Sequence, residues 1–137
     1  MLVIDSIMHV LSLAHFDDHN IQLVPIPSSP SARRRRGRSF IVDITSKIGR
    51  QLDIPVSDSL DVCRKVLDQS GLDATARAEN MLGAFALKRG AFPRGDLILI
   101  DDVMTTGATL TEAARVLRLQ GLHVLASVTA CVAQPLR

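Results

Sequence analysis

The stretch LILIDDVMTTGAT, Leu97–Thr109, decides the fold. Its four leading apolar residues, Leu97–Ile100, form an unbroken run that is typical of a short, fully buried strand. Two carboxylates follow at once, Asp101 and Asp102, and then a turn of threonines and small residues. From Leu110 the apolar residues recur at helical spacing. The sequence therefore predicts a strand, an acidic pair, a small-residue turn and a helix, in that order.

Each part of this stretch has a chemical use. In an open α/β sheet, ligands lie outside the carboxyl ends of the strands. The backbone N–H groups of Thr105–Thr109, the threonine hydroxyls and the positive end of the following helix suit a phosphate group. The carboxylates of Asp101 and Asp102 accept hydrogen bonds when ionised, and so they suit the neighbouring hydroxyls of a sugar. Together these groups fit a ribose 5-phosphate.

A plainer interpretation gives the same residues only local roles. Aspartate often forms turns where a strand ends, and threonine often caps a helix. A cap needs one such residue, whereas this stretch has two adjacent aspartates and a TTGAT turn, so we favour a binding role. A nucleotide hydrolase is disfavoured because the chain has no phosphate loop of the form GxxxxGK[ST].

Length and composition bound the class of protein. The chain has 137 residues, of which 47% are hydrophobic and 22% charged, so we expect one globular domain over residues 1–137. The net charge of +2 is too small to argue by itself for a nucleic-acid partner. Two cysteines without a CxxC pair indicate neither a disulfide framework nor a zinc site, and the cytoplasm is the expected location. The apolar stretch 1–16 is too short to cross a membrane, so no membrane partner is expected.

Hydrophobic spacing predicts the remaining elements. We expect an N-terminal helix within residues 1–20 that packs on the sheet through Ile4, Ile7, Met8 and Leu11. The other expected elements are a strand at Ile21–Val24, a helix from Ser39 to Asp53–Pro55 with the stripe Ile41, Ile44, Ile48 and Leu52, strands at Leu60–Val62, Gly83–Leu87 and Val124–Thr129, a short helix at Ala74–Asn80 capped by Asp73, and a helix stop at Gly121. This alternation predicts an α/β fold with a mostly parallel sheet flanked by helices.

A rigid, basic loop is expected after the first strand. Prolines there exclude a helix and a central strand, and Ser28 and Ser29 precede the arginine run Arg33–Arg36. Serine hydroxyls and guanidinium groups suit a di- or triphosphate. Taken alone, the run fits a solvated loop or a nucleic-acid patch as well as it fits a phosphate site. Its place after a strand favours contact with the pyrophosphate part of a ligand.

These motifs resemble those of a known family. LILIDDVMTTGATL is similar to the phosphoribosyl-pyrophosphate (PRPP) signature of type I phosphoribosyltransferases. The wider chain resembles the ComF-like, competence-associated branch of that group. The carrying motifs are VPIPSS at Val24–Ser29, RRRRG at Arg33–Gly37, DQSGLDATARAENMLGAF at Asp68–Phe85 and IDDVMTTGATLTEAARVL at Ile100–Leu117. The chain departs from the family pattern in lacking an N-terminal zinc module and a hood, and in reading Arg38, Ser39 and Phe40 where many members have Phe-Asn-Gln.

The resemblance implies a site for PRPP and its accompanying Mg²⁺, with no metal-binding residues of the protein's own. It implies that Asp101 and Asp102 are the catalytic residues that hold the ribose hydroxyls. The implied 5-phosphate site is Thr105, Thr106, Gly107, Ala108 and Thr109. The implied pyrophosphate site is Ser28, Ser29, Arg35 and Arg36.

The polar stretch 63–82 is interpreted as a mobile loop. Phosphoribosyl transfer needs such a loop to keep water from the reactive sugar cation. An ordinary surface excursion is the alternative. The expected mobile-loop residues are Lys65, Gln69, Ser70, Gly71 and Arg77, of which Lys65 and Arg77 are candidates for contacting the leaving group.

The expected reaction is displacement of pyrophosphate from C1 of PRPP by a nitrogenous acceptor, through an oxocarbenium-like state. The alternative is a non-catalytic accessory or regulatory protein for competence and DNA uptake that retains a PRPP-like pocket. The absence of a hood, where such enzymes usually bind the acceptor base, favours the alternative. The intact DDVMTTGAT motif favours ligand binding. A homo-oligomer, and DNA or competence proteins as partners, are further candidates.

Overall fold

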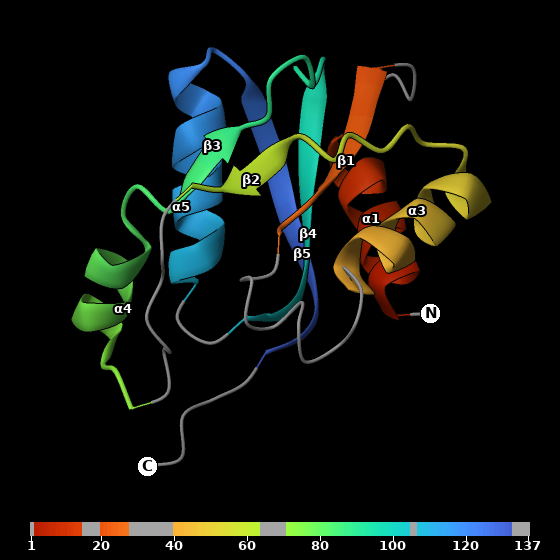
Figure 1. The fold of residues 1–137 in the computed structure, drawn as a ribbon. Coiled ribbons are helices and arrows are strands. Elements are labelled where there is room, and N and C mark those ends of the chain that lie inside the picture. The colour runs from red at the N-terminus through yellow and green to blue at the C-terminus, as the bar shows by residue number, and fades with distance from the viewer. Residues whose placement is uncertain (1, 15–19, 28–39, 64–70, 105–106, 133–137) are drawn as a thin grey trace.

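A parallel three-stranded sheet in the order β1-β4-β5 lies at the centre of the molecule (Figure 1). The computed structural model describes residues 2–14, 20–27, 40–63, 71–104 and 107–132. The strands of this sheet are β1, Ile21–Pro25, β4, Asp96–Met104, and β5, His123–Val132. Leu97–Ile100 are buried in the central strand, as the apolar run predicts for a strand covered on both faces.

Helices cover both faces of this sheet (Figure 1). The helices α1, Leu2–Ala14, and α3, Phe40–Leu52, lie on one face, and α5, Ala108–Leu119, lies on the other. Alternate residues of β4 serve the two faces, because side chains alternate along a strand. Ile98 and Ile100 pack with α1 and α3, whereas Leu97 packs with α5. The predicted α/β class, with a mostly parallel sheet flanked by helices, is confirmed.

A second, antiparallel sheet of two short strands lies beside α5 (Figure 1). It pairs β2, Leu60–Val62, with β3, Phe85–Leu87. Both strands were predicted, but they do not join the parallel sheet. A strand of three residues gives no information about which strand it will pair with, and this pairing therefore could not be predicted.

The helix α4, Ala74–Met81, lies between β2 and β3 in the chain and packs against α5. Its start follows the prediction, since the Asp73 side chain accepts a hydrogen bond from the backbone N–H of Ala76 at 2.8 Å. The last residue of α4, Met81, is buried in the core. The second half of the stretch 63–82 is therefore a capped helix with a buried anchor.

The predicted stripe of α1 is wrong at Met8. Ile7 is fully buried, whereas Met8 is 51% exposed. Ile7 lies at the centre of the buried face, and Met8, turned by about 100° from Ile7, lies beyond the edge of that face. The helix instead packs through Val3, Ile4, Ile7, Val10 and Leu11. The helix is described to Ala14, and residues 15–19 of the predicted span lie outside the described part.

The predicted stripe of α3 is confirmed. Ile41 and Ile48 are buried, and Ile44 and Leu52 pack against the same core. The helix ends at Leu52, and the next residue, Asp53, has a φ of 55° in the left-handed region. Ser39, the predicted cap, lies outside the described residues.

Candidate functional site

The acidic pair lies inside β4. The sequence placed Asp101 and Asp102 just after a strand ending at Ile100, but β4 continues to Met104. The neighbouring β5 supplies the partner, since Asp101 lies opposite Thr129 and the ladder runs on to Met104. Backbone pairing with a longer β5 therefore extends the strand beyond its apolar run.

Asp101 lies on the face of the sheet that α5 covers. Leu97, Leu99 and Asp101 are alternate residues of one strand, and so they share a face. Leu97 and Leu99 belong to the core beneath α5, and Asp101 is only partly buried at the end of this row. A carboxylate on this face is directed to the side of the sheet where α5 begins.

The helix α5 begins with a glycine in an unusual conformation. Gly107 is the cap residue, and its φ of 78° lies in the left-handed region that side chains disfavour. Because glycine has no side chain, the helix receives no side-chain hydrogen bond from its cap residue. The first backbone N–H groups of α5 therefore point out of the positive end of the helix without a capping side chain at Gly107. The helix begins at Ala108, one residue from the expected start near Thr109.

The structure brings part of the predicted site together. Asp101 and the start of α5 both lie at the carboxyl edge of the parallel sheet (Figure 1). Gly71 and Arg77 lie earlier in the chain, before and within α4. The backbone of Asp102 lies in β4. The other predicted residues, namely Ser28, Ser29, Arg35, Arg36, Lys65, Gln69, Ser70, Thr105 and Thr106, lie outside the described residues.

Sequence reasoning missed a buried carboxylate on α5. Glu112 is 5% exposed and accepts a hydrogen bond from the backbone N–H of Gly83 at 2.8 Å. Arg115 donates to both of its oxygens, at 2.6 and 2.9 Å. The hydrogen bond and charge of Glu112 raise the pKa of the Arg115 guanidinium. The spacing of three between an acid and an arginine was the available signal, but this spacing is common on solvated helix faces.

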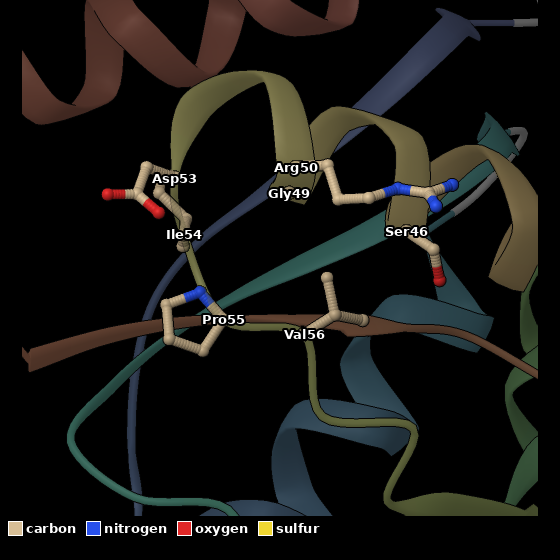
Figure 2. A pocket seen from close by; sticks show the side chains of 7 residues that line it. All are labelled: Ser46, Gly49, Arg50, Asp53, Ile54, Pro55 and Val56. Atoms are coloured by element: carbon tan, nitrogen blue, oxygen red, sulfur yellow. The ribbon is translucent and has the colours of Figure 1, made fainter.

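A hollow of about 480 Å³ lies elsewhere, against the second half of α3 (Figure 2). Its wall combines the polar side chains of Ser46 and Arg50 with apolar Pro55 and Val56 (Figure 2). Gly49 is required at its base, because a Cβ there would lie 2.5 Å from Val56 Cγ2. Among the predicted site residues that the structure describes, none lines this hollow.

Two negative findings concern the described residues. No group of three or more His, Cys, Asp or Glu side chains there is arranged to hold a metal ion. In the same part of the chain, no helix combines the length and the apolar character that crossing a bilayer requires.

Comparison with known proteins identifies a relative. No protein-family model matches the chain. The chain is 33% identical over 104 residues to Competence protein F of Haemophilus influenzae. The chain is a homologue of Competence protein F. The matched region is 74% of this chain but 45% of the relative, so the chain spans less than half of that protein's length. The predicted resemblance to ComF-like proteins is confirmed.

A solved structure also matches the chain. Orotate phosphoribosyltransferase from Aeropyrum pernix is similar over 93% of this chain and 72% of its own. The TM-score is 0.46 and the sequence identity 15%.

Proposed function

We propose that this ComF-like chain binds PRPP with Mg²⁺ and transfers the phosphoribosyl group to a nitrogenous acceptor. The observation that carries the proposal is the arrangement at the end of β4. Asp101 lies on the α5 face of the sheet, six residues before the glycine at which α5 begins without a side-chain cap. A carboxylate suited to sugar hydroxyls and a helix start suited to an anion therefore share one edge of the sheet.

Each part of PRPP has a proposed partner in this chain. Asp101 and Asp102 accept hydrogen bonds from the ribose hydroxyls, and residues Thr105–Thr109 hold the 5-phosphate. The pyrophosphate contacts Ser28, Ser29, Arg35 and Arg36, whose guanidinium groups suit it. The remaining proposed contacts come from the segment 63–82: Lys65, Gln69, Ser70 and Gly71 from its mobile loop, and Arg77 from α4, which packs on α5.

The proposed reaction is a displacement at C1 of the ribose. The acceptor nitrogen forms a bond to C1 with its lone pair while the bond from C1 to the pyrophosphate oxygen breaks. Pyrophosphate leaves with the bonding electrons, and the acceptor loses its proton to solvent. Asp101 and the start of α5 hold the sugar phosphate in place, so that the reacting atoms stay aligned. Mg²⁺ would arrive bound to PRPP and would supply positive charge to the pyrophosphate, since this ion keeps few protein ligands.

Two further points complete the proposal. We propose that residues 1–137 act as one domain in the cytoplasm. Experiment must identify the acceptor base and test whether the chain forms a homo-oligomer. A competence role is the second candidate, and the name of the relative, Competence protein F, favours it. In that case the chain binds PRPP as a regulator or accessory protein for DNA uptake. Binding of PRPP without release of pyrophosphate to any nitrogenous base would favour this second candidate.

The substitution Asp101→Asn tests the proposed site. The amide keeps the shape of the side chain but cannot accept hydrogen bonds with both of its terminal atoms, so we expect calorimetry to show PRPP binding lost. The matched control is Asp96→Asn at the opposite end of β4, where Asp96 accepts from His123 at 2.7 Å on the surface. We expect this control to bind PRPP like the unsubstituted protein. Equal affinity of the Asp101→Asn variant and the unsubstituted protein would refute the assignment.

A further inference from the structure

Glu112 is a buried carboxylate that the proposed reaction does not use. Its position on α5 leaves it 5% exposed, and the side chain of Arg115 is its charged partner. The side chain of Arg115 is 43% exposed, and an ion pair with an exposed partner contributes little to stability, so stability alone is a weak reason for this pair. What the carboxylate adds is a fixed acceptor for one backbone N–H group, that of Gly83 at 2.8 Å.

That N–H group lies where α4 ends. Gly83 follows the helix after Leu82 and has a φ of 72°, in the left-handed region. Met81, the last residue of α4, is buried in the core. The helix α4 packs against α5 (Figure 1). The hydrogen bond from Gly83 to Glu112 therefore joins the segment just after α4 to the second turn of α5.

We infer that Glu112 is a positioning residue for PRPP. It fixes α4 on α5, and α4 carries Arg77, the candidate contact for the pyrophosphate. The proposed 5-phosphate site lies one turn away, at the start of the same helix α5. Because Glu112 and that site belong to one rigid helix, the tether sets the position of Arg77 relative to the bound sugar phosphate. This inference rests on the proposed function.

Two ligands separate positioning from structural support. Ribose 5-phosphate needs only the proposed contacts at Asp101 and the start of α5, whereas PRPP also needs the pyrophosphate contacts. For Glu112→Ala we expect PRPP affinity in the presence of Mg²⁺ to fall about tenfold, within the usual range of coupling between linked sites. Affinity for ribose 5-phosphate should stay within about twofold. A general loosening of α5 would weaken both ligands alike.

Two control variants isolate the tether. Glu112→Gln keeps an acceptor for Gly83 and removes the negative charge. Arg118→Ala removes an exposed arginine from the same helix. Both variants should bind each ligand within about twofold of the unsubstituted protein, because the tether is intact. Calorimetry gives the affinities, and circular dichroism shows whether each variant is folded.

A second measurement needs no substitution. Hydrogen exchange at the Gly83 amide should slow when PRPP with Mg²⁺ binds and should change little with ribose 5-phosphate. Unchanged exchange with bound PRPP would overturn the inference, as would equal losses for both ligands in Glu112→Ala. If the unsubstituted protein binds neither ligand, the proposed function itself is overturned and the inference with it.

Discussion

At the scale of the residue, Gly107 is the position where backbone conformation and proposed chemistry meet. Its φ of 78° suits glycine, and it allows the chain to enter α5 with the backbone N–H groups of the first turn directed outward. Gly121, just beyond the other end of α5, has the same φ of 78°, and a Cβ added there would point into open space. The two glycines therefore form a matched pair, of which only Gly107 lies at the proposed phosphate site.

We expect Gly107→Ala and Gly121→Ala to have similar effects on stability and different effects on binding. Each places a Cβ in the left-handed region and should lower the free energy of unfolding by about 1–2 kcal/mol. Only Gly107→Ala should also weaken ribose 5-phosphate binding, because it shifts the N–H groups at the start of α5. Urea denaturation and calorimetry measure the two effects. Equal weakening of binding by both variants would contradict the role given to Gly107.

At the scale of the element, the helices with strong local signals were predicted from the sequence. The stripe Ile41, Ile44, Ile48 and Leu52 predicted α3, and Asp73 predicted the start of α4. Strand ends and partners were not predictable, because they depend on pairing between distant segments. Asp101 was placed beyond a strand that in fact continues, since β5 provides a partner as far as Met104.

The cap of α4 offers a prediction at this scale. Asp73→Ala removes the hydrogen bond to the N–H of Ala76 and should destabilise α4 by about 1 kcal/mol. Asp73→Asn should cost much less, because asparagine is an equally good cap. Hydrogen exchange within Ala74–Met81 measures the local effect. Exchange that is as slow in Asp73→Ala as in the unsubstituted protein would show that the cap does not hold the helix.

At the scale of the whole molecule, the core divides into two layers on either side of β4. Leu99 lies in the layer under α5, and Ile98 lies in the layer under α1 and α3. The sequence predicted the central run and the flanking helices, and hence this division. It could not predict that Glu112 is buried beside the exposed Arg115, because charged residues at this spacing more often face solvent.

The free energy of unfolding of the whole molecule should depend on the apolar side chains buried in β4 and not on exposed apolar residues. Leu99→Ala leaves a cavity in a fully buried position and should lower the free energy of unfolding by about 2–5 kcal/mol. Met8→Ala, at a position that is half exposed, should change it by no more than about 0.5 kcal/mol. Urea denaturation measures both variants. A large loss for Met8→Ala would show that α1 packs differently from the arrangement in Figure 1.

The measurement that tests the central claim most directly is a calorimetric titration of the unsubstituted protein with PRPP. The titration is repeated with and without Mg²⁺, and with ribose 5-phosphate and pyrophosphate in place of PRPP. The proposed site at Asp101 and the start of α5 predicts Mg²⁺-dependent binding of PRPP, and weaker binding of ribose 5-phosphate. Absence of binding for all three ligands would contradict the proposal, and the DDVMTTGAT stretch would then be a structural feature of the fold alone.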